Sequence, residues 1–412
     1  TTNHLMKLPF LKKFNFEIPL AWSQLSHQKV RFIVATTGVC FANILMFTQV
    51  GLLRMLTDGT TKLHESLGGD LFLVSSFSPT LRWNTSFPRA YIYQASAVNG
   101  VADTTPVYLG TGDWLNPEFL LENNQDDSSL KTMERFGKQV RIIAFNPAKS
   151  NSFNLPDVQQ QIDKLRMPSS ILYDSLSQSS LGEVPALYKQ RGQITTLVDN
   201  HRTHIVGLFD MGSTLFTNGN VVMSDWNYSQ RRGSAVLNNV SIGLVFLEKG
   251  ANINQVKAQI RAILPPDIEI HTREELIARE HKFESSEPNG IILRFGTAVG
   301  FVVGVIIVYQ VLYSDINDHL SEYATLKAMG YSDNYLLFVV IQEAVILAIM
   351  GFIPGYFIST GLYQLLVTLT KIPLAMKASV AIQVFILTVV MCAVSGAIAT
   401  TKLRSADPAD VF

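Results

Sequence analysis

The chain has 412 residues, enough for two or three structural units, and its 33 basic and 33 acidic side chains leave no formal net charge. A nucleic-acid-binding protein carries a basic excess, so this balance argues against that class. The hydrophobic residues, 47% of the chain, are concentrated in four blocks. Cys40 and Cys392 both fall inside these blocks, so the polar middle of the chain has no thiol for a disulfide.

The segment LAWSQLSHQKVRF at residues 20–32 leads into the first apolar block. Trp22 followed by Lys29 and Arg31 is typical of a helix at a membrane surface, because the ring suits the headgroup region and the cations attract anionic lipid. We therefore expect residues 1–30 to form a cytoplasmic N-terminus with an interfacial helix. The alternative is an ordinary lead-in to a membrane span.

Each apolar block is long enough to cross a bilayer, which takes about 20 apolar residues in a helix. The sequence predicts transmembrane helices at 31–54, 289–314, 334–360 and 379–401, joined by short loops at 315–333 and 361–378 and followed by a tail at 402–412. Cations mark the cytoplasmic side of a span. They cluster before the first span, at Lys7, Lys12, Lys13, Lys29 and Arg31. Both termini are therefore expected in the cytoplasm, although Lys371 and Lys377 in the last loop go against this rule.

Residues 55–288 mix strand and helix patterns and are expected outside the cytoplasmic membrane. GDLFLVSS, QVRIIAFNP and VSIGLVFLEKG are typical of strands, and ITTLVDNHRTHIVGLFDMG is typical of two strands joined by a turn at Asp199 and Asn200. NLPDVQQQIDKL predicts a helix with Asn154 as N-cap and Pro156 in its first turn, and INQVKAQIRAIL predicts a second helix. The predicted fold class is a four-helix membrane protein with a large α+β extracytoplasmic domain between its first two spans.

The sequence contains no recognisable catalytic constellation. His201 and His204 lie three apart in a strand pattern, which directs them to opposite faces, and no acid or cysteine cluster surrounds them, so we expect no metal site. A G-x-x-x-x-G-K-[ST] motif is absent, so the chain is not expected to bind and split ATP by that device. We therefore predict that the chain is not an enzyme and holds no cofactor.

Two features of the predicted spans have both a structural and a functional explanation. Gly296, Gly300 and Gly304 form a small-residue face for helix packing, or else simply fill a span. Gln342 and Glu343 lie in the otherwise apolar third span, where a carboxylate is costly and is by default a functional hypothesis. The structural alternative is that Glu343 reaches the nearby membrane surface. Pro354 is expected to loosen the same span.

The loop at 315–333, DINDHLSEYATLKAMGYSD, predicts a short helix between two spans. Asp315 and Asp318 come first, where carboxylates favour a helix N-terminus, and Gly330 fits a helix stop. About ten residues make a marginal helix alone in water, but a partner's groove or a membrane surface stabilises one. Spacing alone leaves open a docking helix and a mere connector. The candidate docking residues are Asp318, His319, Leu320, Glu322, Tyr323, Ala324, Thr325, Leu326, Lys327, Met329 and Gly330.

Nearly the whole chain resembles DevC-type permeases, which belong to the MacB/FtsX-like superfamily of ABC transporters. The matching stretches are LAWSQLSHQKVRFIVATTGVCFANILMFTQVGLL, NVSIGLVFLEKGANI, GFVVGVIIVYQVLYSDINDHLSEYATLKAMGYSD, IQEAVILAIMGFIPG and ADPADVF. The run YQVLYSDINDHLSEYATLKAMGYSD is the most specific of them. The segment EHKFESSEPNG before the second span departs from the subfamily, which has an aromatic pair there, so the membrane junction is expected to differ.

The resemblance implies a homodimeric permease of the bacterial inner membrane. A separate DevA-like ATPase, with its own ATP and magnesium, would grip the helix at residues 318–330. A DevB-like periplasmic adaptor would join the outer domain to a TolC-like outer-membrane channel. The implied function is export of a glycolipid or related envelope lipid by mechanotransmission, in which closure of the ATPase moves the outer domain.

Three other functions remain open within this resemblance. The chain could be a drug or peptide efflux permease, a lipoprotein-release permease, or an FtsX-like transducer that signals without transport. The transducer relative usually has a smaller outer domain, so the length of residues 55–288 favours an exporter coupled to an adaptor.

Overall fold

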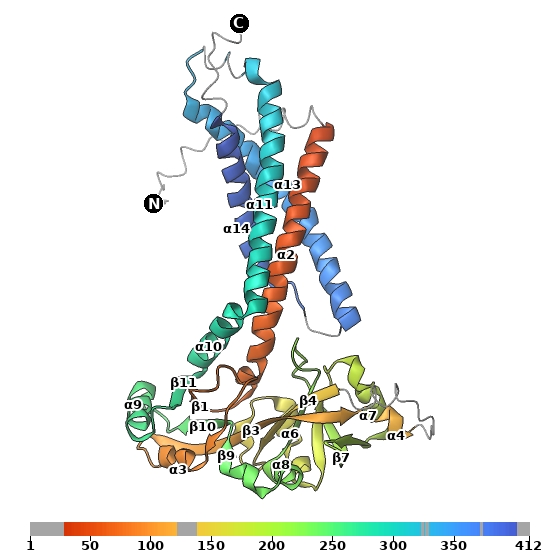
Figure 1. Ribbon diagram of the computed structural model, residues 1–412, viewed down its shortest axis with the longest axis vertical. Helices are drawn as coiled ribbons and strands as arrows, with labels where there is room; N and C mark the ends of the chain where they lie inside the picture. The colour runs from red at the N-terminus through yellow and green to blue at the C-terminus, as the bar shows by residue number, and fades with distance from the viewer. Residues whose placement is uncertain (1–28, 122–137, 323–324, 326–328, 371–373, 402–412) are drawn as a thin grey trace, which may run out of the picture. The chain divides into compact units, whose positions relative to one another are not determined.

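The computed structural model describes residues 29–121, 138–322, 325, 329–370 and 374–401 (Figure 1). The predicted interfacial helix and the tail at 402–412 lie outside the described residues. The chain divides into two compact units. The helical unit comprises residues 1–51, 293–362 and 376–412, and the α+β unit comprises residues 52–292 and 363–375.

Four helices are long and apolar enough to span a membrane. They are α2 (Lys29–Ser66), α11 (Pro288–Asp318), α13 (Asp333–Thr370) and α14 (Ala378–Ala399). A large α+β unit is inserted between the first two, so the predicted fold class is confirmed. The helices extend beyond three of the predicted spans, because hydropathy marks only the apolar part of a helix. α2 continues past residue 54, α11 continues past residue 314, and α13 continues past residue 360 and through Pro354.

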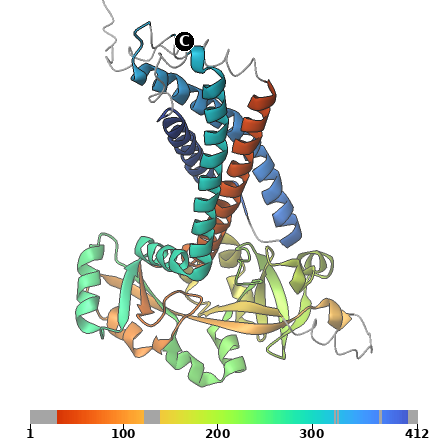
Figure 2. The same cartoon turned by 45° about the horizontal axis from the view of Figure 1, so that its top comes forward.

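Small residues allow the helices of the helical unit to approach closely. Figures 1 and 2 both show α11 lying beside α2 and α14. A Cβ added at Gly304 would lie 3.0 Å from that of Ala42, and one at Gly300 would lie 3.4 Å from that of Leu45. One at Gly296 would collide with the α2 side chain beside it. The predicted packing face of these three glycines is therefore confirmed.

The core of the helical unit is apolar, with a few polar contacts between helices. Val39, Met46, Val308, Leu347 and Val384 are representative of its buried side chains, which come from all four helices. The Thr388 hydroxyl donates to Asn43 Oδ1, which joins α14 to α2. The Ser395 hydroxyl donates to the Val305 carbonyl at 3.0 Å, which joins α14 to α11. Such contacts fix helix register where apolar packing alone is not directional.

The α+β unit is built on a nine-stranded sheet with the order β11-β1-β10-β3-β4-β8-β5-β7-β6. β3 is the longest strand, and it pairs with β10 through its first half and with β4 through its second half. β6 returns to pair with the end of β3, so β3, β4, β8, β5, β7 and β6 close into a ring. The strands are β1 (Leu71–Ser75), β3 (Val101–Leu115), β4 (Lys138–Phe145), β5 (Ser170–Asp174), β6 (Ile194–Val198), β7 (His201–Phe209), β8 (Asn220–Ser224), β10 (Ile242–Leu247) and β11 (Ile268–Thr272), with β2 (Phe87–Pro88) and β9 (Asn239–Val240) forming a separate pair.

The strands predicted from the sequence are present, and the turn between β6 and β7 has the predicted residues. Asp199 and Asn200 have φ values of 50° and 61°, a conformation that asparagine and aspartate tolerate and that two-residue hairpins need. Apolar side chains cover both faces of the sheet, because helices and loops pack on each face. Trp114, Tyr173 and Ile142 lie in one cluster, and Phe72 and Phe145 lie in the other.

Helices of the α+β unit cover the sheet (Figure 2). Thr272 and Glu275 form a reciprocal capping box at the start of α10, and Asn252 caps α9. The predicted cap at Asn154 was wrong. The helix begins at Pro156 after Leu155, and the Asn154 amide instead donates to a distant carbonyl. The helices are α3 (Ala90–Ser96), α4 (Glu118–Leu121), α6 (Pro156–Gln160), α7 (Val184–Arg191), α8 (Asp225–Arg232), α9 (Ile253–Ile263) and α10 (Arg273–Ser286), with 3-10 helices at Ser150–Ser152, Ile162–Arg166, Ser179–Leu181 and Ser234–Asn238.

Candidate functional sites

The segment between α11 and α13, residues 319–331, is called here the coupling segment. It begins with a one-residue turn at His319, whose N–H donates to the Asp315 carbonyl at 3.1 Å. The His319 ring lies 3.2 Å from Glu322 Oε1 and 3.9 Å from Asp315 Oδ1. Leu320 packs against the core of the helical unit. The start of the segment is therefore fixed to the bundle.

The end of the coupling segment is also defined. Gly330 has a φ of +93°, which a glycine adopts without strain, as expected of a helix stop. The ring of Tyr331 lies 4.8 Å from that of Tyr335, which packs against the helical core. Between these two anchors, Glu322, Thr325 and Met329 are exposed. A short exposed surface is thus held on a fixed base.

The N-terminal end of this segment differs in detail from the prediction. Asp315 and Asp318 lie in the last turn of α11, and helical residues resume at 320–322 after a break. The helical backbone persists after the apolar residues end, so the break comes at His319 instead of Asp318. Four predicted docking residues, Tyr323, Ala324, Leu326 and Lys327, lie outside the described residues.

The two polar residues predicted in the third span differ in their surroundings. Gln342 is half-buried, whereas Glu343 is buried and both of its carboxylate oxygens lack a hydrogen-bond partner among the described residues. Its neighbours Val340, Ala344 and Leu347 belong to the apolar core of the helical unit. Glu343 is therefore buried among apolar side chains of the bundle, and its role in function or in packing stays a prediction.

A buried polar cluster in the α+β unit joins the end of α2 to α10, and sequence reasoning missed it. We call it the α2–α10 junction and define it as His64, Arg82, Arg273, Glu280 and Glu284. His64 Nε2 lies 3.2 Å from Glu280 Oε2, and both side chains are at least 97% buried. The same carboxylate oxygen accepts the backbone N–H of Leu81 at 3.3 Å. One acidic side chain thus ties α10 to α2 and to the loop at residues 76–86.

Two arginines extend the junction. Arg82 lies 3.2 Å from the buried carboxylate of Glu284, and its guanidinium lies over the ring of Phe216. Arg273 donates to three backbone carbonyls at and just after the last turn of α2. They belong to His64, Leu67 (2.8 Å) and Gly69 (3.1 Å). A cation at the carbonyl end of a helix is favourable because it satisfies backbone acceptors and the helix dipole.

The electrostatics of the junction follow from its burial. Burial raises the pKa of the Glu284 carboxyl, and the Arg82 guanidinium opposes this shift. Arg141 on β4 is not a member of the junction but senses Glu280 and Arg82; desolvation lowers its pKa to about 10, which leaves its guanidinium charged at neutral pH. Burial also lowers the pKa of His281, the residue next to Glu280. The cluster is therefore held by charges that have left bulk water, and such pairs cost several kcal/mol to break.

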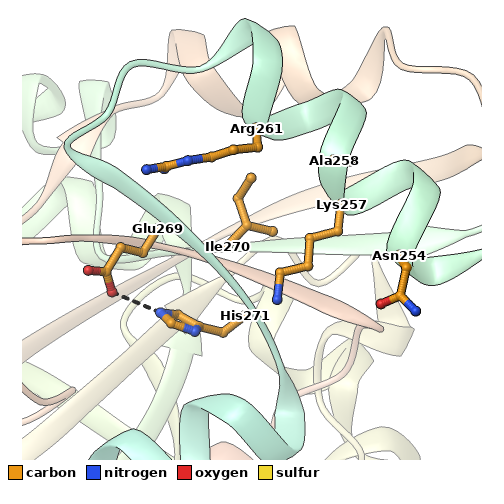
Figure 3. A pocket seen from close by; sticks show the side chains of 7 residues that line it. All are labelled: Asn254, Lys257, Ala258, Arg261, Glu269, Ile270 and His271. Carbon is orange, nitrogen blue, oxygen red and sulfur yellow. Dashed lines mark hydrogen bonds and ion pairs between the residues drawn. The ribbon is translucent and has the colours of Figure 1, made fainter.

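A pocket of about 390 Å³ lies between α9 and the edge strand β11 (Figure 3). Its cations are already engaged. Lys257 pairs with Glu275, and His271 Nε2 lies 2.8 Å from Glu269 Oε2. Arg261 donates to the Ile268 carbonyl on the edge strand. An edge strand such as β11 presents backbone polar groups that could pair with a strand of another chain. These contacts occupy polar groups at that edge, so we interpret the arrangement as protection of the edge.

The part of the chain that the structure describes contains no group of three histidine, cysteine or acidic side chains able to hold a metal ion. Cys40 and Cys392 are both buried and unpaired.

Comparison with known proteins adds one family match. Residues 294–408 match the model of the FtsX-like permease C-terminal region, which takes in most of α11, the coupling segment, α13 and α14. A search of curated proteins found no match to the sequence.

Two solved structures resemble part of the chain. The periplasmic region of MacB from Actinobacillus actinomycetemcomitans is 8% identical, with a TM-score of 0.34, and the match covers 54% of this chain and 95% of that one. The extracellular domain of the noncanonic ABC-type transporter YknZ from Gram-positive bacteria is 11% identical, with a TM-score of 0.32, and the match covers 50% of this chain and 99% of that one.

Proposed function

We propose that this chain is the permease subunit of an ATP-driven transport system of the MacB/FtsX-like superfamily, in which a separate ATPase supplies the force. The observation that carries the proposal is the match of residues 294–408 to the FtsX-like permease C-terminal region. That region contains three of the four candidate spans together with the coupling segment.

The coupling segment is the surface that the ATPase would grip. It exposes Glu322, Thr325 and Met329 between an anchor at Leu320 and an aromatic contact at Tyr331. An ATPase that binds the described residues of this segment would act directly on the helical unit, because Leu320 packs against its core. Groove binding of a short helix is a recurring mode of recognition.

Force entering there has a continuous path toward the α+β unit. α2 and α11 each supply residues to both units as unbroken helices. Within the α+β unit, α2 is bound to α10 by the buried pair of His64 and Glu280. A displacement of either helix would thus be passed to the sheet as a change of state of one packed body.

The finer assignment follows from the DevC-type resemblance and is also proposed. The permease would be a homodimer in a bacterial inner membrane with both termini in the cytoplasm. A DevA-like ATPase, a DevB-like adaptor and a TolC-like channel would complete the system. Its cargo would be a glycolipid or related envelope lipid, moved by mechanotransmission.

A charge reversal on the coupling segment tests the proposal. Glu322→Lys changes an exposed side chain and is expected to abolish both co-purification of an ABC ATPase and the ATP hydrolysis that the complex stimulates. Glu248→Lys is the matched control, because Glu248 is exposed on the α+β unit. An unaltered complex with unaltered hydrolysis in Glu322→Lys and Met329→Asp would refute the docking role.

A further inference from the structure

Two large aromatic side chains are exposed on one ordered loop of the α+β unit. The loop at residues 76–86 follows β1 and exposes 70% of Phe77 and 50% of Trp83. It is held by its own hydrogen bonds. The Thr85 N–H donates to the Ser78 hydroxyl at 2.6 Å, and the Trp83 N–H donates to Thr80 Oγ1 at 3.1 Å. The aromatic rings are therefore presented by a fixed backbone, and exposed apolar groups that are held in place indicate an interaction surface.

The loop is fastened to α10. The ring of Trp83 packs edge-on against that of Phe283, with centroids 5.9 Å apart. Arg82 pairs with Glu284 in the same turn of α10, and Arg279 donates to the Ser78 carbonyl at 2.7 Å. These three contacts fix the position of the loop relative to the end of the helix.

The end of α10 is also where the chain turns into its second candidate span. The span begins at Pro288, and the turn between the two helices is tight, because a Cβ at Gly290 would lie 2.4 Å from the Glu284 carbonyl oxygen. Ile291 and Ile292, the first apolar residues of α11, are both exposed. Trp83 and its partner Phe283 therefore lie next to the point where α11 becomes apolar.

We propose that the loop at residues 76–86 rests on the surface of the phospholipid bilayer, with Phe77 and Trp83 in the headgroup region. The loop is fastened to α10, which leads directly into the apolar start of α11, and this is why we assign the surface to lipid in preference to a protein partner. Tryptophan suits this position because its ring is apolar and its N–H is polar. The Arg82 guanidinium lies 4.3 Å from the Trp83 ring centroid and helps to hold the ring in place.

This contact goes beyond the proposed coupling to an ATPase and depends only on α11 crossing the membrane. It gives the α+β unit a second attachment to the bilayer besides its connecting helices. Any movement of the unit would then press on or release the lipid surface beneath the loop.

The test uses the full chain in phospholipid nanodiscs, with Cys40→Ala and Cys392→Ala, and single spin labels at Phe77→Cys and Trp83→Cys. Labels at Tyr93→Cys and Trp226→Cys are matched controls, because these residues are 59% and 51% exposed on α3 and α8. Power saturation compares access of oxygen, which concentrates in lipid, with access of a water-soluble nickel chelate. We expect a higher oxygen-to-nickel ratio at 77 and 83 than at both controls.

Two outcomes would overturn the proposal. Ratios at 77 and 83 equal to those of the controls would place the loop in water, and poor access of both reagents would mean that a protein covers it. If the cysteine substitutions impair folding, quenching by brominated phospholipid in the unlabelled chain gives a second measurement. Trp83→Phe should then reduce the quenched fraction of tryptophan fluorescence and Trp226→Phe should not. No reduction by Trp83→Phe would equally overturn the proposal.

Discussion

Removing the Glu280 carboxylate tests the α2–α10 junction in energetic terms. Glu280 and His64 are buried and lie 3.2 Å apart, and the carboxylate also accepts the Leu81 N–H. Glu280→Leu leaves that N–H without an acceptor and removes the carboxylate that faces the buried His64 ring. Breaking a buried pair by removing one member costs about 3–5 kcal/mol.

This cost converts into a measurable shift of the melting temperature. For a domain of 150–250 residues, each kcal/mol moves Tm by about 2–4 °C, so Glu280→Leu should lower the Tm of the α+β unit by about 6–20 °C. The assay is thermal unfolding of the full chain in detergent, followed by tryptophan fluorescence. Trp114 reports on this unit, because it is buried in the core of the ring of strands.

A double variant separates the energy of the interaction between His64 and Glu280 from the other effects of each substitution. Replacing both members by apolar residues removes the unpaired partner, so His64→Leu combined with Glu280→Leu should be less destabilised than the sum of the single variants by about 0.5–3 kcal/mol. Glu248→Leu, at an exposed position, is the control and should stay within about 0.5 kcal/mol of the parent. If Glu280→Leu behaved like this control, the Glu280 carboxylate would not stabilise the α2–α10 junction. If the two single effects simply added, His64 and Glu280 would not be energetically coupled.

Three further predictions concern packing and charge. Gly351→Ala should destabilise the helical unit by about 1–3 kcal/mol in thermal unfolding, because the new Cβ would lie 2.6 Å from that of Val39, whereas Gly361→Ala, with open space around it, should not. Burial holds the folded-state pKa of His281 below its ordinary value of 6.5. The neutral His281 side chain therefore contributes to stability above pH 6.5, and this contribution is lost as pH falls through the folded-state pKa. In denaturant titrations at several pH values, His281→Gln should remove that part of the pH dependence, and an unchanged slope would contradict the reasoning. Glu343→Leu should raise the melting temperature of the helical unit, because the carboxylate it removes is buried and has no hydrogen-bond partner among the residues that the structure describes; a lower melting temperature would mean that the carboxylate is satisfied in the assembled protein.

The sequence predicted the elements whose causes are local. Apolar length alone located the four spans, and the turn at Asp199 and Asn200 was found because these residue types suit a positive φ. The predicted helix ends differ from the structure where the contact that sets the helix end is not local. The extension of α2 to Ser66 is polar, and Asn154 serves a carbonyl of Leu67 instead of capping the next helix.

The candidate sites divide in the same way. The positive φ of Gly330 in the coupling segment could be predicted, because glycine at a helix end has a local cause. The α2–α10 junction could not, because Leu81 and Glu280 are 199 residues apart and neither stands in a recognisable motif. Nothing in the sequence around His64 indicates that its partner lies on α10, since only the folded sheet brings the two helices together.

The most direct test of the account is whether nucleotide turnover on one side of the membrane changes the α+β unit on the other. Hydrogen exchange at the backbone amides of α10 would be measured in the reconstituted complex of the chain with its ATPase, with and without ATP. The account predicts that ATP changes the protection of α10 in the parent and in Glu248→Lys, and leaves it unchanged in Glu322→Lys. Identical exchange with and without ATP in an actively hydrolysing parent complex would contradict the transmission of force through this chain.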